Sequence, residues 1–232
     1  MFKTSLNFFL FKVIFFFERF KSNCLKKKIK KIDDIELNNF KNFIKNKNFT
    51  TFWFLNNFKL FSFFLPKNEK EIFNYLEIGS FEGMSALFVA NKYKDSNIVC
   101  VDTWSMSLNK SQILDFDFQE IEKNFDKNLI GLNLLKIKDT SRNAYSKILK
   151  LKYNYDYIYI DGSHDGEDIY FDATQSFKIL KKGGIMIFDD ISTIDRNVNL
   201  QAFQAFEKFY KENKKNIRVL YLKRLAVIKK VI

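Results

Sequence analysis

The chain has 232 residues, 47% of them hydrophobic, which excludes general disorder and fits one α/β domain with an N-terminal extension. The two cysteines, Cys24 and Cys100, lie far apart, so neither a disulfide framework nor a zinc knuckle is indicated, and a reducing cytoplasm is expected. Residues 1–70 hold 15 Lys and Arg against 5 Asp and Glu, which accounts for +10 of the net charge of +12. The basic character therefore belongs to the extension, and charge alone identifies no ligand.

The first 35 residues combine an apolar segment with a run of lysines. Leu6–Leu10 and Val13–Phe17 are too short and too interrupted for a membrane-spanning helix, and they lack the cleavage site of a signal peptide. The five lysines within residues 26–31 suggest a helix on an anionic membrane surface, with its phenylalanines inserted. An amphipathic helix that packs on the domain or on a second subunit is the alternative, so peripheral membrane association through residues 1–35 and a homo-oligomer both stay open.

The rest of the chain predicts helices followed by alternating strands and helices. Residues 37–70 are expected to form helices that cover a ligand cleft. Strands are expected at 74–79, 97–102, 133–137, 156–161 and 184–189, and helices at 84–94, 115–128, 141–151, 168–180 and 199–213. This spacing implies right-handed βαβ units and a parallel sheet. Ile217–Leu222 and Leu225–Val231 are separated by two residues and predict an antiparallel hairpin.

The predicted fold is therefore an α/β, Rossmann-like doubly wound sheet of about seven strands. It is mostly parallel, ends in a β-hairpin and follows a helical extension. The expected division is residues 1–70 for the extension and residues 71–232 for the domain.

The first expected strand runs into a turn with two glycines, Tyr75-Leu-Glu-Ile-Gly-Ser-Phe-Glu-Gly-Met-Ser85. Gly79 allows unusual backbone dihedral angles, and Gly83 lets the next helix begin close by, so that backbone N–H groups face a ligand. The pattern lacks the Gly-x-Gly-x-x-Gly of dinucleotide sites, which favours S-adenosylmethionine (SAM) over NAD. A tight connection without a ligand is the alternative.

Polar residues also follow the second and third expected strands, at the edge where doubly wound sheets bind ligands. Asp102 lies 23 residues after Gly79 and can accept hydrogen bonds from both hydroxyls of a ribose, or cap the next helix. The segment Lys138-Asp-Thr-Ser-Arg142 falls where an adenine should lie, although helix capping explains it equally well.

Carboxylates end the fourth and fifth expected strands. Asp161 and the adjacent Asp189 and Asp190 should meet at one edge, where they would repel one another unless a cation lies between them. An all-oxygen ligand set suits Mg²⁺, which would bind a substrate hydroxyl and lower its pKa. His164, the only histidine, could then remove the proton as a general base. In the alternative, the adjacent carboxylates cap a helix and His164 only packs.

Together these motifs resemble a class I SAM-dependent methyltransferase, and more narrowly the small metal-dependent O-methyltransferase family that includes sugar and antibiotic O-methyltransferases. The resemblance covers about residues 50–230 and rests on Leu76–Gly83, Val101–Trp104, Ile160–His164, and Leu180–Gly184 followed by Asp189-Asp190. The cofactor-binding residues that we expect are Glu77, Gly79, Ser80, Gly83, Asp102, Thr103, Trp104, Ser141 and Asp161. The resemblance implies metal ligation by Asp161, Asp189 and Asp190 and catalysis by Asp161 and His164, which stands where catechol-type enzymes place a lysine. Relatives commonly have a glycine just before Ser141, and this chain does not.

The expected reaction is transfer of a methyl group from SAM to a hydroxyl of a small molecule, sugar or glycan precursor. It would take place in the cytoplasm or at the inner face of the membrane. A non-catalytic SAM- or nucleotide-binding protein is the alternative. A nucleic-acid methyltransferase is disfavoured, because the sole proline is Pro66 and the Asn/Asp-Pro-Pro-aromatic motif of such enzymes is absent.

Overall fold

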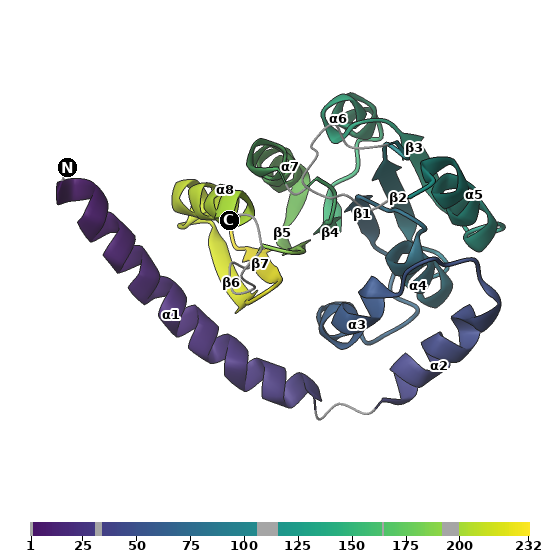
Figure 1. Ribbon diagram of the computed structural model, residues 1–232, viewed down its shortest axis with the longest axis horizontal. Coiled ribbons are helices and arrows are strands. Elements are labelled where there is room, and N and C mark those ends of the chain that lie inside the picture. Colours follow the sequence, from purple (N-terminus) through teal and green to yellow (C-terminus); the bar gives the residue numbers. More distant parts are fainter. Residues whose placement is uncertain (1, 31–33, 106–115, 164, 192–199) are drawn as a thin grey trace.

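A computed structural model describes residues 2–30, 34–105, 116–163, 165–191 and 200–232, with residues 2–14, 200 and 201 described by their backbone alone (Figure 1). Seven strands form one sheet in the order β3-β2-β1-β4-β5-β7-β6. Their bounds are β1 Asn74–Ile78, β2 Asn97–Asp102, β3 Leu135–Lys138, β4 Tyr155–Ile160, β5 Leu180–Phe188, β6 Ile217–Leu222 and β7 Ala226–Lys230. Strands β1 to β5 are parallel, whereas β7 is antiparallel to both β5 and β6. The predicted fold class is confirmed.

Helices cover both faces of the sheet (Figure 1). The described helices are α1 Phe2–Lys30, α2 Ile35–Phe43, the 3-10 helix Ile44–Asn46, α3 Trp53–Phe64, α4 Met84–Lys92, α5 Phe118–Asn128, α6 Ser141–Lys150, α7 Gly166–Ile179 and α8 Leu200–Asn213. One hydrophobic core lies between the sheet and α6, α7 and α8, and the other between the sheet and the helices α2 to α5. The side chains of β1 point alternately to the two faces of the sheet, since Leu76 and Ile78 join the first core and Tyr75 joins the second.

Element boundaries differ from the predicted ones where the local sequence is mixed. Strand β5 begins at Leu180 and not at residue 184, because Lys181, Lys182 and two glycines hide the strand pattern although this stretch is extended. Helix α5 begins at Phe118, since the side chain of Asp117 accepts hydrogen bonds from the N–H groups of the second and third helical residues. Residues 106–115 lie outside the described part of the chain.

Helix α1 is longer than the apolar segment that predicted it, with 29 residues. It packs on the edge strand β6, where the backbone N–H of Leu222 donates a 2.8 Å hydrogen bond to Ser22 Oγ. Part of the extension therefore packs on the domain, and the boundary near residue 70 stays a prediction. Within the described residues, no helix is both long and apolar enough to cross a membrane.

The strand order reverses direction between β1 and β4. After β3 at one edge of the sheet, the chain returns past β1 and continues with β4 on the other side of it. Strand β1 leads to β2 on one side, and β4 pairs with β1 on the other. In doubly wound sheets this is the switch point, where ligands bind beyond the carboxyl ends of the strands. The predicted site residues that the structure describes lie along this edge or in the segments that follow it.

Candidate active site

The turn after β1 depends on Gly79 and Gly83, whose φ angles are 89° and 79°. A Cβ atom at Gly79 would lie 2.1 Å from the carbonyl oxygen of Asp161 and 2.5 Å from Cα of Gly162. At Gly83 it would lie 2.5 Å from a methyl carbon of Leu129. Gly79 therefore lets the ends of β1 and β4 touch, and Gly83 lets α4 begin against the end of α5.

Two buried oxygens near this turn lack partners within the described residues. Glu77 has no exposed surface, and its Oε2 accepts a 2.5 Å hydrogen bond from Tyr75 Oη while Oε1 accepts none. Ser80 is 3% exposed, and its Oγ is also without a partner in that part of the chain. Burial raises the pKa of Glu77 to about 7, although the nearby hydroxyls of Tyr75, Ser85 and Ser80 act to lower it. A buried polar atom without a partner costs about 1–3 kcal/mol, so these oxygens suit the amino-acid end of SAM, whose ammonium group can donate to them.

Asp102 joins the turn after β1 to the turn after β2. Its Oδ2 accepts from the backbone N–H of Phe81, and its Oδ1 from that of Trp104, both at 2.8 Å. Phe81 and Trp104 have φ angles of 47° and 42°, a conformation that residues other than glycine seldom adopt. Because each carboxylate oxygen has a second lone pair, Asp102 can still accept a ribose hydroxyl.

Thr103 and Trp104 have structural roles in the turn after β2. The hydroxyl of Thr103 exchanges 3.3 Å hydrogen bonds with the backbone of Ser105. Trp104 is 3% exposed, its Nε1 donates to the carbonyl of Phe81, and its ring centre lies 4.7 Å from that of Phe125. The indole therefore supports the turn from inside, and cofactor contact by these two residues stays a prediction.

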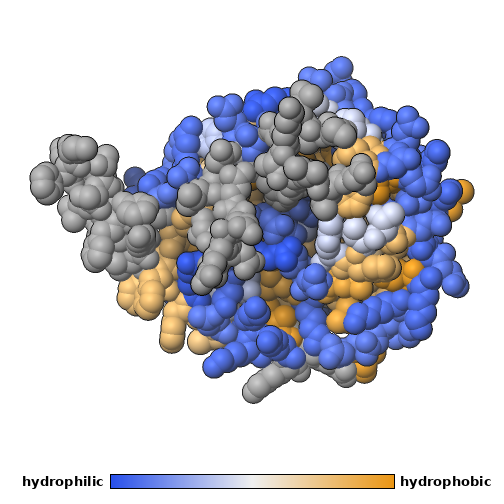
Figure 2. All heavy atoms as spheres, viewed as in Figure 1, coloured by the Kyte–Doolittle hydropathy of each residue, from blue (hydrophilic) through white to orange (hydrophobic). Residues whose placement is uncertain are grey.

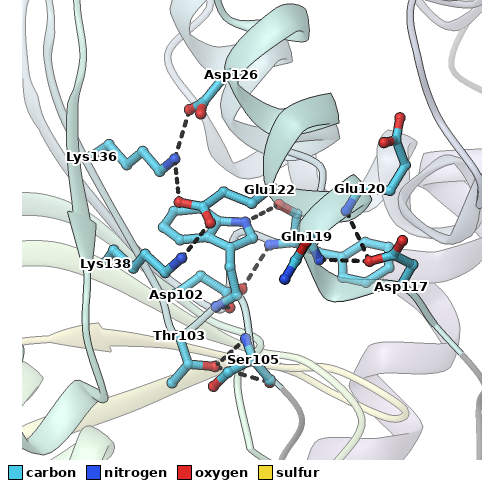
Figure 3. Close-up of polar contacts among 12 residues, drawn as sticks. Asp102, Thr103, Ser105, Asp117, Gln119, Glu120, Glu122, Asp126, Lys136 and Lys138 are labelled. Carbon is cyan, nitrogen blue, oxygen red and sulfur yellow. Dashed lines mark hydrogen bonds and ion pairs between the residues drawn. The ribbon is translucent and has the colours of Figure 1, made fainter.

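Figure 3 shows how α5 is fixed beside this turn. Lys136 of β3 contacts Glu122 and Asp126 of α5 at 2.8 and 2.7 Å, and Lys138 also pairs with Glu122. The ammonium of Lys136 lies 4.5 Å from the centre of the Trp104 ring. These contacts hold β3, α5 and the turn after β2 together.

Ser141 is the first residue of α6, beyond the end of β3. The helix is capped by Thr140, whose side chain accepts a 3.3 Å hydrogen bond from the N–H of Asn143. The residue that caps this helix is therefore Thr140. Burial raises the pKa of Asp172 on α7 to about 7. A hydrogen bond from Ser141 has the opposite effect and lowers this pKa. Ser141 therefore faces α7, and its predicted contact with adenine is untested.

On the other side of the switch point, Asp161 and Asp189 lie side by side. The hydroxyl of Tyr159 contacts Asp161 Oδ2 at 3.0 Å and Asp189 Oδ2 at 2.7 Å. Burial, followed by the charges of Asp189 and Asp190, raises the pKa of Asp161 well above its usual range. One hydroxyl proton is thus shared between two carboxyl groups that cannot both ionise easily.

Asp189 and Asp190 have protein partners as well. Asp189 Oδ2 accepts a 2.9 Å hydrogen bond from Asn57 Nδ2, and its Oδ1 accepts a 2.8 Å bond from the N–H of Asp190. Asp190 Oδ1 lies 2.5 Å from Arg224 Nε, which is 3.9 Å from Asp189 Oδ1. The cation beside these carboxylates is therefore a guanidinium from the β6–β7 turn.

This arrangement does not fit the predicted metal site. Among the described residues, no three His, Cys, Asp or Glu side chains are grouped to hold a metal ion. Asp161, Asp189 and Asp190 do approach one another as the sequence predicts, but Asp190 pairs with Arg224, and Asp189 is engaged by neutral donors. His164 lies outside the described residues.

Helix α3 lies along the edge of the sheet from one half to the other. At its start the Trp53 ring stacks on Phe81, with centres 5.8 Å apart, and also contacts Phe116. One turn later Asn57 reaches Asp189. Trp53 remains 49% exposed, so an aromatic surface borders the site.

Three of these site residues did not emerge from the sequence. Tyr159 had a usable signal, because it lies two residues before Asp161 and thus on the same face of β4. Asn57 and Arg224 had none, since Asn57 is 132 residues from Asp189 and Arg224 is 34 residues from Asp190. Contacts between residues so far apart in the chain produce no periodic pattern in the sequence.

The fold is Rossmann-like, and the turn after β1 has two glycines but lacks the Gly-x-Gly-x-x-Gly of dinucleotide sites. The model of a methyltransferase domain family, methyltransferase family 24, matches residues 76–191, half of the chain. The chain therefore belongs to this family, and the prediction of a class I SAM-dependent methyltransferase is confirmed.

One curated relative and two solved structures show what else this chain is similar to. The uncharacterised protein R132 of Acanthamoeba polyphaga mimivirus is 31% identical over 125 residues, which are 53% of this chain and 53% of that protein. The match thus spans about half the length of this curated relative. The O-methyltransferase TomG of Streptomyces achromogenes, solved with SAM, is similar with a TM-score of 0.53 and 13% identity over 68% of this chain and 73% of TomG. The MycE methyltransferase of mycinamycin biosynthesis, solved with Mg, S-adenosylhomocysteine and mycinamycin VI, has a TM-score of 0.52 and 14% identity over 82% of this chain and 53% of MycE.

Proposed function

We propose that this chain transfers the methyl group of SAM to a hydroxyl group, with a small molecule, sugar or glycan precursor as the acceptor class. The observation that carries the proposal is the pair of buried oxygens, Glu77 Oε1 and Ser80 Oγ, which have no partner within the described residues. They stand beside a turn that only glycine can form, in a chain of the methyltransferase family. SAM supplies a methyl group on a positively charged sulfur, which a hydroxyl oxygen can attack.

In this proposal, residues at the ends of β1 and β2 bind different parts of the cofactor. Glu77 and Ser80 bind the amino-acid end, with Gly79 and Gly83 keeping the space clear of side chains. Asp102 accepts hydrogen bonds from the ribose while the backbone of Phe81 and Trp104 holds the carboxylate in place. Ser141 is the proposed neighbour of the adenine.

The acceptor would bind on the β4–β5 side, below α3. The exposed face of Trp53 offers an aromatic surface against which the apolar face of a sugar ring or a planar ring can pack. His164 follows β4 by four residues and is the proposed general base for the hydroxyl proton. TomG, which has a similar fold, is an O-methyltransferase, and this favours a hydroxyl acceptor.

The proposed reaction passes through no metal ion. MycE was solved with Mg. In this chain, Mg²⁺ at Asp161, Asp189 and Asp190 would first require Asp190 to leave Arg224. Metal dependence is therefore a separate question, which a binding measurement can answer.

The test is calorimetric titration of SAM into the purified chain, followed by transfer of a labelled methyl group to a panel of sugars, glycan precursors and phenols. Each assay is run with Mg²⁺ and with a chelator. We expect SAM to bind in both conditions. Asp102→Ala should weaken SAM binding, whereas His164→Ala should lower the transfer rate and leave SAM affinity nearly unchanged.

The possible failures are distinct. Absence of SAM binding would contradict the cofactor assignment itself. SAM binding without methyl transfer to any hydroxyl would favour the non-catalytic alternative. Equal loss of SAM binding in both variants would show that the division of roles is wrong.

A further inference from the structure

Helix α1 has an inner face that packs on the domain. Phe15, Ser22 and Ile29 are spaced by seven residues, and all three are buried at 1–4% exposure. The ring of Phe15 lies 5.5 Å from that of Tyr210 on α8, and Ser22 bonds to β6. This face fixes how the helix is oriented on the domain.

The opposite face of α1 leaves three phenylalanines in solvent. Phe16, Phe17 and Phe20 are 66%, 60% and 63% exposed, and they lie within one turn of one another. Figure 2 shows apolar surface at the lower left of the molecule, along the course that Figure 1 gives α1. Clustered exposed aromatic side chains mark an interaction surface more often than isolated ones do.

Positive charge follows directly on this surface. Lys26, Lys27, Lys28 and Lys30 are all exposed, in the last two turns of the helix. In the part of the chain that the structure describes, no ion pair joins any of the four to a carboxylate.

The β6–β7 turn adds to the same cluster. Burial, together with the positive charges of Lys26, Arg19 and Lys30, lowers the pKa of Lys223. Cations from two distant parts of the sequence thus converge on one side of the molecule and repel one another. An anionic surface would relieve that repulsion.

We propose that the outer face of α1 docks on an anionic lipid bilayer, with Phe16, Phe17 and Phe20 entering the boundary between headgroups and acyl chains. The lysines of residues 26–30 and Lys223 then lie at the lipid phosphates. A second copy of the chain fits less well, because the same face of another copy offers the lysines no cluster of carboxylates with which to pair. The phenylalanines of this surface belong to α1, which contributes no residue to the candidate site, so the inference does not rest on the proposed function. Lys223 is the neighbour in sequence of Arg224, which pairs with Asp190.

The experiment measures sedimentation of the full chain with vesicles of phosphatidylcholine, with and without phosphatidylglycerol. We expect binding only to the anionic vesicles, and its loss as salt is raised. The triple change Phe16→Ser, Phe17→Ser and Phe20→Ser should weaken binding at least about tenfold. Its matched control is Ile130→Ser, which alters an equally exposed apolar side chain, 79% exposed, elsewhere on the domain.

The charge is tested separately with Lys26→Gln, Lys27→Gln and Lys28→Gln. At about 1 kcal/mol for each lysine near an anionic surface, the three changes should weaken binding about 100-fold. Lys150→Gln with Lys152→Gln is the control, because these residues lie near the end of α6. Thermal unfolding and SAM titration confirm that each variant is folded.

Two outcomes would overturn the proposal. One is that the wild type fails to bind anionic vesicles, or that the folded phenylalanine variant binds them as well as the wild type. The other is a dimer in solution that the phenylalanine changes dissociate, which would assign this face to a second copy.

Discussion

The two sides of the switch point differ in how their polar groups are satisfied. At the ends of β1 and β2, here the cofactor half, the shape comes from backbone turns, and two buried oxygens have no partner within the described residues. At the ends of β4 and β5, here the acceptor half, the carboxylates already have partners in Tyr159, Asn57 and Arg224. A ligand adds contacts in the cofactor half, whereas in the acceptor half a cation would have to displace existing ones.

By this comparison the cofactor half is preformed for a ligand, whereas contacts in the acceptor half would have to change before a cation could bind there. Unpartnered buried oxygens are costly without a ligand, so the cofactor half is stabilised by binding. In the acceptor half, a guanidinium of the chain itself offsets part of the negative charge, because Arg224 lies against Asp190 and near Asp189. The three predictions that follow test each half, beginning with the largest expected effect.

Gly79→Ala should break the contact between the two halves. A Cβ atom there would lie 2.1 Å from the carbonyl oxygen of Asp161, on a residue with a φ angle of 89°. Since backbone has to move on both strands, we expect a loss of about 3 kcal/mol or more in the free energy of unfolding, and no measurable SAM binding. Urea unfolding followed by circular dichroism measures the first effect, and calorimetry the second.

Gly131→Ala is the matched control for this change. Gly131 has a φ angle of 78°, but no atom lies within 4 Å of the place its Cβ would take. The free energy of unfolding of this variant should fall only by the cost of a non-glycine residue at a positive φ angle, about 1 kcal/mol, and SAM should bind normally. If both variants lost the same amount, crowding at Gly79 would not be the reason for its glycine.

The cofactor half was the more predictable of the two from sequence. The turn from Gly79 to Gly83 is local, so its glycines and Asp102 follow from strand periodicity and spacing, and the role expected of Glu77 follows from the family resemblance. The sheet was predictable for the same reason, since buried strands and amphipathic helices have different periods. The hairpin of β6 and β7 was visible in two apolar runs separated by two residues.

The acceptor half was predictable only in its acidic members. Adjacent parallel strands bring Asp161 beside Asp189, because Ile160 of β4 pairs with Phe188 of β5. What balances these charges could not be derived, since Asn57 and Arg224 come from α3 and from the β6–β7 turn. The sequence predicted a cation beside these carboxylates, and in the structure the guanidinium of Arg224 lies beside Asp190.

Glu77→Gln tests the charge of the cofactor half. Burial raises the pKa of Glu77 to about 7, so the side chain is largely protonated at pH 6 and ionised at pH 8. Only the ionised form pairs with an ammonium group. Because part of the α-ammonium of SAM is deprotonated at pH 8, wild-type SAM affinity should fall about fourfold between pH 8 and pH 6. The variant should bind more weakly at pH 8 and show little change with pH.

The same shift predicts the direction of the stability change without SAM. Because the folded-state pKa is above the unfolded value, Glu77 disfavours folding as pH rises from about 4 through 7, and saturating SAM should reduce this loss. Calorimetric titrations across this pH range measure the affinities. A wild-type affinity that stays constant from pH 6 to pH 8 would show that Glu77 does not bind the cofactor's ammonium group.

Arg224→Gln tests the electrical balance of the acceptor half. Removing the guanidinium leaves Asp190 and Asp189 without their nearest cation. We expect Mn²⁺, used as a probe for hard divalent ions, to bind weakly to the wild type and at least about fivefold more tightly to the variant, a gain of about 1 kcal/mol. Arg218→Gln removes an exposed arginine from β6 and should leave Mn²⁺ affinity unchanged.

Calorimetric titration of Mn²⁺ at pH 8 measures both variants, and SAM affinity shows whether the cofactor half is intact. Tight Mn²⁺ binding to the wild type, lost in Asp189→Asn, would mean that the carboxylates prefer a metal ion to Arg224. Weak binding that Arg224→Gln strengthens would instead place the arginine and the metal in competition for one acidic edge. Since the guanidinium and the ion cannot both lie against Asp190, this competition would make the β6–β7 turn a determinant of metal dependence in this chain.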